Sequence, residues 1–371
     1  MRRLARTQTM RLAPERRDRL LQLRRALHRW RTQGNGAWNE WRRLAGLTLG
    51  GPLGDHAPRA NRTLVRYDDG RVIDRYFQRI RELPRPLVCV VKHSAFARIA
   101  WDNRRLGIPT VACPANLEAL DVGATLEGRS DRAYYLTALN LGDELRALAA
   151  CDARLFLSSV ETGLVNGLGQ PAHYYPYRPV GQLEAEMQRV RTARVHTMVD
   201  PQLLVMLGSA VHPTTGESFR WFLQEAQRNG LPEGIKLMLC GNGAEDLAQG
   251  GTLPQGVEAR GWVDQAELMT LLSRTCGVIL PQLIGFGGLT RLAELSCAGV
   301  PTLVSSHAAR AVDPLPPGVI PVEDTWPAWR AGIEQLLVGP HSDLQQAGAY
   351  AAWAQQQANP WPAVLNTLAP G

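Results

Sequence analysis

The chain has 371 residues, enough for two ordinary domains that each bury a core of their own. Hydrophobic residues make up 45% and charged residues 20%, the composition of a folded globular protein. The net charge of +7 comes from residues 1–43, which hold thirteen arginines and three acidic residues, so the remainder is slightly acidic and a nucleic-acid partner is excluded.

The six cysteines are dispersed and show neither a CxxC pair nor a Cys/His ligand spacing. Most lie inside apolar runs, which predicts buried free thiols in a reducing compartment, without a disulfide framework or a zinc site. No apolar run reaches the length of a membrane span, and the N-terminus lacks the apolar core of a signal peptide. We therefore expect a cytoplasmic protein.

Residues 1–59 are predicted to form a basic helical extension, with a helix at 14–31 that begins with a proline and ends before the Gly-Asn-Gly turn at 34–36. Its apolar stripe consists of Leu20, Leu23, Leu27 and Trp30. One interpretation is a helix lying on an anionic membrane surface, at the inner face of the membrane. The other is a helix that docks its stripe on the protein itself. The sequence leaves both open.

Residues 60–195 alternate short apolar runs with amphipathic stretches, the pattern of a parallel sheet with crossover helices. The strand candidates are 63–67, 87–93, 110–113 and 154–159, and the helix candidates are 71–82, 96–106 and 132–150. A break rich in proline and tyrosine follows at 171–180, and 181–193 is predicted to be a helix or a linker. We expect this half to be one Rossmann-like domain.

Residues 196–330 repeat this rhythm. The strand candidates are 203–209, 235–243, 257–263, 277–282 and 301–306, with helix candidates at 216–229, 265–274 and 289–298. The end of the chain, 331–371, is expected to pack back across the domains as helices, predicted at 326–338 and 342–368 with an interruption near 359–362. The expected fold class is α/β, with two Rossmann-like doubly wound domains facing each other across a cleft.

Three strand candidates of the second half end in small residues, at 207–210, 240–243 and 284–288. Glycine lets a ligand approach the backbone, and free N–H groups at the following helix can hold a diphosphate. A single loop of this kind has a structural explanation, because tight strand-to-helix turns also need glycine. Three of them on the ligand-binding edge of one domain favour a nucleotide site.

Behind the last of these loops, Arg291 and Glu294 are three residues apart and share one face near the start of a helix. An arginine there opposes the helix dipole, which an anion at the same place would offset. Glu294 is suited to accept hydrogen bonds from two ribose hydroxyls. The alternative is an ion pair on a solvated helix. A dehydrogenase fingerprint is disfavoured, because Thr290 stands where a third glycine is needed and no acidic residue ends the strand candidate at 301–306.

The second half resembles the retaining glycosyltransferases of the B-type fold, the group called family 4 or group 1. The resemblance runs from about 203 to 322 through LLVMLGSAVHPTTGESFRWFL, KLMLCGNG, VEARGWVDQAELMTLLSRTCGVILP and GFGGLTRLAELSCAGVPTLVSS. The last piece is similar to a signature of this family at Gly285, Gly287, Arg291, Glu294, Gly299 and Pro301. As a combined pattern it is specific to the fold and to the site of the sugar donor, although not to the sugar.

The resemblance implies a nucleotide-sugar donor held mainly by the C-terminal domain. Glu294 would bind the ribose, Arg291 and the glycine loop would meet the diphosphate and sugar, and the backbone around Trp262 would flank the base. The residues expected to contact this donor are Gly208, Ser209, Gly241, Asn242, Trp262, Val263, Gly285, Phe286, Gly287, Gly288 and Leu289. Phe286 is a departure, because many members carry a glutamate there.

The first half matches the family more loosely. KHSAFA at 92–97 and CPANLEALD at 113–121 look like the strand-end histidine and the following loop of this family. The resemblance implies that His93 positions the acceptor or the donor sugar, and that Asn116 and Glu118 contact acceptor hydroxyls. A packed structural histidine and a helix-capping Glu118 are the alternatives. Ser158, Ser159 and Glu161 follow the next strand candidate and resemble the "S-x-x-E" region of this family. The nearest candidate for the family's opening strand and glycine loop is 47–54.

The expected reaction is transfer of a sugar from a nucleotide diphosphate to a hydroxyl-bearing acceptor, with His93, Arg291 and Glu294 as catalytic residues. Positive potential at the glycine loop would stabilise the leaving diphosphate. No carboxylate pair at a strand end suggests Mg²⁺, so we expect neither metal nor cofactor, the nucleotide sugar being a co-substrate. Retention is implied by the resemblance alone. The alternatives are an epimerase-like enzyme acting on nucleotide sugars and a non-catalytic protein that binds a partner or glycan.

Overall fold

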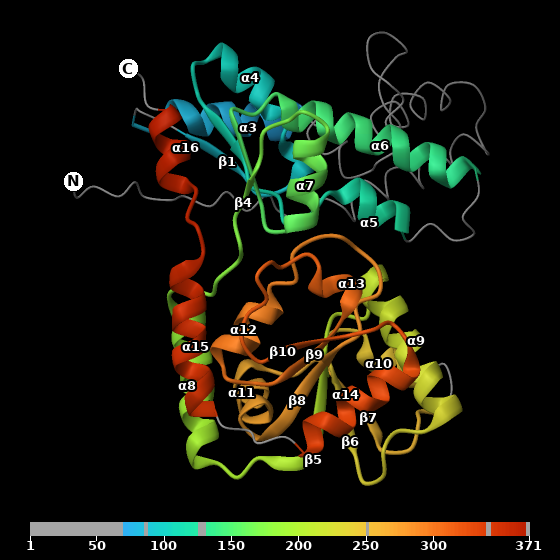
Figure 1. Cartoon of the computed structure of the whole chain (residues 1–371). Coiled ribbons are helices and arrows are strands. Elements are labelled where there is room, and N and C mark those ends of the chain that lie inside the picture. The colour runs from blue at the N-terminus through green and yellow to red at the C-terminus, as the bar shows by residue number, and fades with distance from the viewer. Residues whose placement is uncertain (1–69, 85–87, 125–130, 250–251, 339–342, 369–371) are drawn as a thin grey trace.

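The computed structural model describes residues 70–84, 88–124, 131–249, 252–338 and 343–368. Over these residues the chain forms two α/β domains, drawn one above the other in Figure 1. The predicted basic extension at 1–59, with its helix at 14–31 and the loop at 47–54, and the strand candidate at 63–67 lie outside the described residues.

The N-terminal domain contains, in the described part of the chain, a four-stranded parallel sheet of order β1-β2-β3-β4. Its strands are β1 (Cys89–Val91), β2 (Thr110–Ala112), β3 (Ala153–Phe156) and β4 (His173–Tyr174). Its helices are α3 (Gly70–Arg81), the 3₁₀-helix η2 (Ser94–Phe96), α4 (Ile99–Arg105), α5 (Glu118–Ala124), α6 (Asp131–Ala149) and α7 (Ser159–Gly167). This sheet is the first of the two expected Rossmann-like units.

The C-terminal domain contains a six-stranded parallel sheet of order β10-β9-β8-β5-β6-β7 within the described residues. Its strands are β5 (Asp200–Leu207), β6 (Lys236–Cys240), β7 (Val257–Gly261), β8 (Thr275–Leu280), β9 (Thr302–Ser305) and β10 (Val319–Val322). Its helices are α9 (Pro213–Asn229), α10 (Ala244–Gln249), α11 (Gln265–Arg274), α12 (Arg291–Cys297), α13 (Ser306–Ala309) and α14 (Trp326–Val338). Numbered within the domain, this is the doubly wound order 3-2-1-4-5-6, which reverses between β5 and β8.

Local sequence explains why the central elements form. All six residues of β8 are buried, as expected for a parallel strand covered by helices on both faces. Helix α9 has Pro213 in its first turn, where the missing N–H costs nothing, and it stops at Gly230, whose φ of 75° favours glycine. Helix α11 is capped by Asp264, whose side chain accepts from the Glu267 N–H.

Two segments cross from one domain to the other. Helix α8 (Gln182–His196) follows the N-terminal sheet, but it packs against α11 and α12, and its Met187 and Val190 belong to the C-terminal core. The predicted boundary at 195/196 therefore separates this helix from the domain on which it packs. The boundary predicted at 330/331 falls inside α14.

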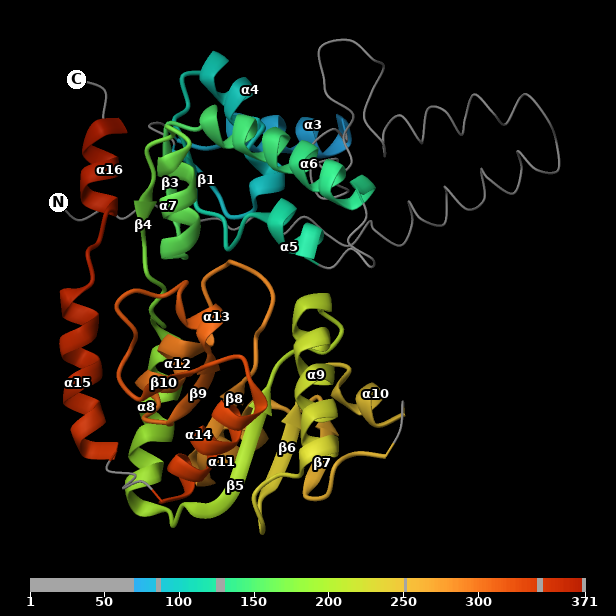
Figure 2. The same cartoon turned by 45° about the vertical axis from the view of Figure 1, so that its right-hand side comes forward.

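The end of the chain returns to the N-terminal domain. Helix α15 (Asp343–Gln356) lies beside α8, and α16 (Trp361–Leu368) lies at the upper domain (Figure 2). Val364 of α16 packs with Val111 and Leu155 of the N-terminal sheet. No helix among the described residues is long and apolar enough to cross a membrane.

Candidate functional site

The reversal of strand order brings the carboxyl ends of β5 and β8 side by side. Nη1 of Arg291 donates a hydrogen bond to the carbonyl oxygen of Leu207, the last residue of β5, at 2.7 Å. Nε2 of Gln282, just after β8, donates to Oγ1 of Thr214 at 3.2 Å. The two loops are thus joined across the point where such sheets bind ligands. Burial lowers the pKa of Arg291, and the nearby charge of Glu294 opposes this shift.

The glycines at the ends of β5 and β6 allow these loops to approach each other. A Cβ on Gly241 would lie 1.8 Å from the carbonyl oxygen of Gly208, and the φ of Gly241 is 135°. A Cβ on Gly243 would lie 2.7 Å from Cγ1 of Val211. Close packing of the loops therefore accounts for Gly241, whereas a Cβ on Gly208 would lie 2.6 Å from Cγ2 of Thr215 on α9. Contact of either glycine with a nucleotide stays a prediction.

The glycine loop at 285–288 packs against the N-terminal domain. A Cβ on Gly287 would lie 2.7 Å from Cβ of Asn116, and one on Gly288 would lie 2.5 Å from the carbonyl oxygen of Leu157. Oγ of Ser158, which caps α7, donates to the carbonyl oxygen of Phe286 at 2.6 Å. Residues expected at the sugar donor thus meet a residue expected at the acceptor across the domain boundary.

Glu294 points to the segment between the domains. Its Oε1 accepts a hydrogen bond from the hydroxyl of Tyr177 at 3.0 Å. Burial and the charge of Glu294 raise the pKa of Tyr177. The glutamate and Arg291 both belong to α12, a helix of seven residues, and they contact different neighbours.

The remaining residues expected at the sugar donor lie along the same edge of the sheet. Trp262 follows β7 and is 72% exposed, whereas Val263 and Leu289 pack against the C-terminal core. Asn242 is exposed and Ser209 is half-buried. The side chain of Trp262 therefore presents a large apolar surface to solvent at this edge.

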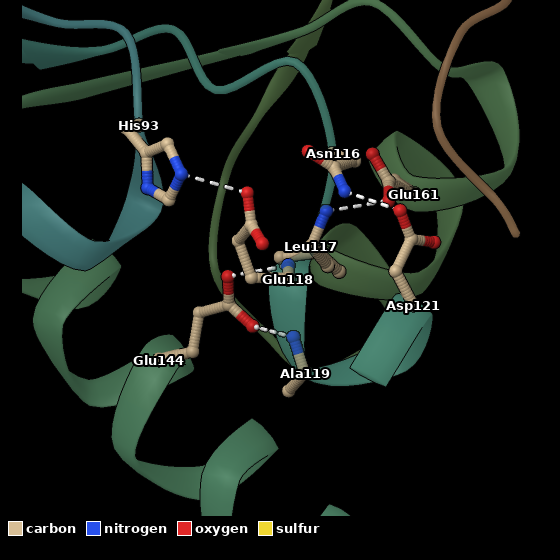
Figure 3. Close-up of polar contacts among 8 residues, drawn as sticks. All are labelled: His93, Asn116, Leu117, Glu118, Ala119, Asp121, Glu144 and Glu161. Atoms are coloured by element: carbon tan, nitrogen blue, oxygen red, sulfur yellow. Dashed lines mark hydrogen bonds and ion pairs between the residues drawn. The ribbon is translucent and has the colours of Figure 1, made fainter. Parts of the chain in front are cut away.

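In the N-terminal domain, His93 and Glu118 lie together (Figure 3). Nε2 of His93 and Oε1 of Glu118 are 2.8 Å apart, with the histidine side chain 36% and the glutamate side chain 20% exposed. Asn116, also expected at the acceptor, donates its amide hydrogen to Asp121 instead of pointing to this pair. Burial is the largest cause that raises the pKa of Asp121.

Two buried carboxylates hold the turn that carries Glu118. Oε1 and Oε2 of Glu144 accept from the N–H groups of Glu118 and Ala119 at 2.8 and 2.9 Å (Figure 3). Oε1 of Glu161 accepts from the Leu117 N–H at 2.6 Å. Burial is the main cause that raises the pKa of Glu144 to about 7 and that of Glu161 to about 8.

Glu144 is the residue of this group that the sequence analysis missed. It is fully buried, and it lies on α6 beside Ala147 and Leu148, which are buried in the core of the N-terminal domain. The sequence did contain a signal for a buried Glu144. This glutamate lies four residues before a core leucine of an amphipathic helix, and therefore on the same helix face.

The described residues contain no group of three or more His, Cys, Asp or Glu side chains that could hold a metal ion. The six cysteines, all among the described residues, are free thiols. Four of them are buried as predicted, whereas Cys89 and Cys113 are half-buried.

No protein-family model matches the chain, and neither does any curated protein sequence. Solved structures do match. A UDP-forming α,α-trehalose-phosphate synthase from Burkholderia vietnamiensis aligns over 80% of this chain and 76% of its own, at 12% identity and a TM-score of 0.53. Sucrose-phosphate synthase from Thermosynechococcus elongatus aligns over 85% and 79%, at 16% identity and a TM-score of 0.55. HepE from Anabaena, in complex with UDP and glucose, aligns over 80% of both chains, at 10% identity and a TM-score of 0.56.

The chain has the GT-B fold. This confirms the expected fold class, two Rossmann-like doubly wound domains. The glycine loop at 285–288 and the turn around Asn116 meet between the two domains. At identities of 10–16% the likeness establishes the fold alone.

Proposed function

We propose that the protein is a glycosyltransferase that moves a sugar from a nucleotide-diphosphate donor to a hydroxyl acceptor. One observation carries this proposal. The loop in front of Arg291 and Glu294, at the strand-order reversal of a GT-B fold, contacts the turn that bears Asn116 and Glu118 in the opposite domain. Because substrates of such a transfer must meet between the domains, this contact supports a shared reaction site.

Arg291 and Glu294 would hold the sugar donor. Arg291 donates one of its five N–H groups to the Leu207 carbonyl oxygen, and this hydrogen bond fixes the guanidinium at the end of β5. Its charge would stabilise the diphosphate as the bond to the anomeric carbon breaks. Glu294, held by Tyr177, would accept hydrogen bonds from ribose hydroxyls.

The acceptor would bind on the N-terminal side, where His93 and Glu118 form a partly exposed pair. The departing phosphate would take the proton of the acceptor hydroxyl, and the sugar would be transferred with retention, without a metal. Retention rests on the resemblance of the motif around Arg291 to family 4, and metal independence rests on the sequence, in which no carboxylate pair at a strand end suggests Mg²⁺.

Loading the sugar donor requires the domains to separate. The contacts of Gly287 and Gly288 with Asn116 and Leu157 leave no room for a phosphate between these atoms. The hydrogen bond from Ser158 to Phe286 closes the same boundary. We infer that the described conformation is a closed one and that the donor binds an opened form.

A thermal-shift screen against UDP-, GDP-, ADP- and CDP-sugars tests the proposal, because a ligand that binds the native state raises the apparent stability. One of these compounds should stabilise the wild type, whereas Arg291→Ala and Glu294→Ala should lose both this shift and most of the turnover. Glu233→Ala, at an exposed position, serves as the control. Unchanged transfer in both site variants would refute their roles.

A non-catalytic binding protein is the second candidate. Phe286, where many family 4 members carry a glutamate, packs its ring 5.3 Å from that of His307, so this position offers the sugar an apolar group. Binding of a nucleotide sugar without transfer or hydrolysis, across a panel of acceptors, would favour this candidate. Conversion of the free nucleotide sugar without an acceptor would instead identify an epimerase-like enzyme.

For location we propose the cytoplasm, with attraction to an anionic membrane surface through the thirteen arginines of residues 1–43. Co-sedimentation of the full chain with vesicles containing phosphatidylserine, at low and high salt, tests this attraction. Equal recovery with uncharged phosphatidylcholine vesicles would contradict it.

A further inference from the structure

Asn116 lies in the turn between β2 and α5, and Glu118 is the first residue of α5. Side chains from later helices hold the backbone of this segment. The N–H groups of Leu117, Glu118 and Ala119 are successive, and all three donate to carboxylate oxygens. One acceptor comes from α6 and the other from α7. These N–H groups lie at the start of α5, where a helix leaves its first donors without internal partners.

The two carboxylates differ in how they bind the turn. Both oxygens of Glu144 accept, one from the Glu118 N–H at 2.8 Å and one from the Ala119 N–H at 2.9 Å. Glu161 uses Oε1 for the Leu117 N–H, and its buried Oε2 has no hydrogen-bond partner among the described residues. Glu144 therefore fixes both the position and the direction of the backbone at Glu118, whereas Glu161 fixes one point.

Helix capping alone does not require this arrangement. A serine, threonine or aspartate at the N-cap would satisfy these donors at the helix surface. Here two fully buried glutamates do so, and burial of a carboxylate is costly. The direct result of the arrangement is that the Glu118 side chain reaches His93 at 2.8 Å, although both remain open to solvent.

We propose that Glu144 is a positioning residue, which holds the Glu118 backbone so that the His93–Glu118 pair is assembled for the acceptor. The role of the pair rests on the proposed function. Three contacts connect Glu144 to this pair. Its two carboxylate oxygens accept from the N–H groups of Glu118 and Ala119, and the Glu118 side chain contacts the imidazole of His93.

A matched pair of substitutions tests this proposal. Glu144→Gln puts an NH₂ group against one of the two N–H donors, so one hydrogen bond is lost and the turn is displaced. Glu161→Gln makes the same chemical change at an equally buried position, but its carbonyl oxygen can still accept from the Leu117 N–H. A general effect of changing a buried carboxyl group to an amide would act on both variants alike, whereas the proposed role would act on Glu144→Gln alone.

Two measurements separate this role from a merely structural one. The imidazole resonances of His93 in the full chain should shift in Glu144→Gln toward those of Glu118→Gln, and they should stay near wild type in Glu161→Gln. The KM for the acceptor should rise about tenfold in Glu144→Gln with the nucleotide-sugar affinity unchanged, the effect expected for losing a hydrogen bond to a charged group.

The proposal is overturned if Glu144→Gln leaves the His93 resonances and the acceptor KM at wild-type values, or if both variants change them equally. Should Glu144→Gln fail to fold, Glu144→Asp replaces it, since the shorter side chain keeps the charge but does not span both N–H groups. Wild-type His93 resonances in that variant would equally overturn the proposal. Failure of the proposed function appears separately, as the absence of any nucleotide-sugar thermal shift in the wild type.

Discussion

The hydroxyl of Tyr177 donates a hydrogen bond to the carboxylate of Glu294 at 3.0 Å. Tyr177 lies on the segment between β4 and α8, and Glu294 lies on α12, so the bond connects the crossing between the domains to the expected ribose-binding residue. A carboxylate has about four acceptor sites, so the bond leaves capacity for ribose hydroxyls. Its effect is to orient Glu294.

Tyr177→Phe should therefore weaken binding of the nucleotide sugar without changing the chemical step. We expect the donor KM to rise roughly three- to tenfold, the value of one hydrogen bond, with kcat near that of the wild type. Steady-state kinetics with the nucleotide sugar found in the thermal-shift screen measure both constants. Tyr175→Phe, on the same segment with its ring against Trp361, is the control. A fall in kcat at constant KM would contradict this role for Tyr177.

Gly287→Ala should prevent the domains from closing. The added Cβ would lie 2.7 Å from Cβ of Asn116, a distance that real Cβ contacts do not show. Transfer should fall on the order of 10- to 100-fold because the substrates are misplaced, whereas the nucleotide sugar should still bind. Small-angle scattering should report a larger radius of gyration.

The control for this substitution is Gly348→Ala, on α15, where a Cβ would meet no atom within 4 Å. It should leave both transfer and the radius of gyration unchanged. If Gly287→Ala behaves in the same way, the contact between the glycine loop and Asn116 does not belong to the active conformation.

Gly241→Ala should destabilise the C-terminal domain. The φ of 135° and the distance of 1.8 Å to the Gly208 carbonyl oxygen both exclude a side chain. We expect a loss of roughly 2–4 kcal/mol in the free energy of unfolding, measured by urea denaturation. Gly169→Ala, with a φ of 78° but open space around its Cβ, should cost only about 1 kcal/mol. Equal losses would mean that backbone strain, not contact between the loops, makes glycine necessary.

The sequence predicted five of the six strands that the structure describes in the C-terminal domain, and it missed β10. Runs such as that of β8 are apolar at every position because the sheet is covered on both faces, and this pattern is visible without a structure. Strand β4 was missed, since it contains two residues inside a segment rich in proline and tyrosine. Helix α5 was missed because the groups that satisfy its first N–H donors, Glu144 and Glu161, lie on other helices.

Part of the candidate site could also be predicted from the sequence. His93 and Glu118 follow neighbouring parallel strands, whose carboxyl ends meet, so their proximity could be expected from the sheet alone. The glycines at 208 and 241 are predicted to approach phosphates, and the structure shows in addition that a Cβ on Gly241 would meet the carbonyl oxygen of Gly208. A glycine at such a position indicates that another group lies close to the backbone. The sequence alone does not say whether that group belongs to a ligand or to another loop.

Protonation of Glu161 should make stability depend on pH. Its pKa is raised by burial from 4.5 to about 8, so between about pH 5 and pH 8 the native state binds more protons than the unfolded chain. The free energy of unfolding therefore falls as the pH rises through this window and levels off above it. Glu161→Gln removes this term, so the stability of the variant relative to the wild type should increase from pH 5 to pH 8. Urea denaturation curves that run parallel over this range would contradict the assignment.

The return of α16 to the N-terminal sheet has a consequence for how the molecule can move. Within the described residues the chain passes between the domains twice, and Nη1 of Arg178 on the first passage donates to the carbonyl oxygen of Ala354, near the second, at 2.6 Å. Two covalent connections tied together at one side would act as a hinge, about which we expect the halves to swing open. Substrate entry would then occur at the rim opposite the hinge, and cutting the peptide after α15 would leave the halves joined by a single, looser connection.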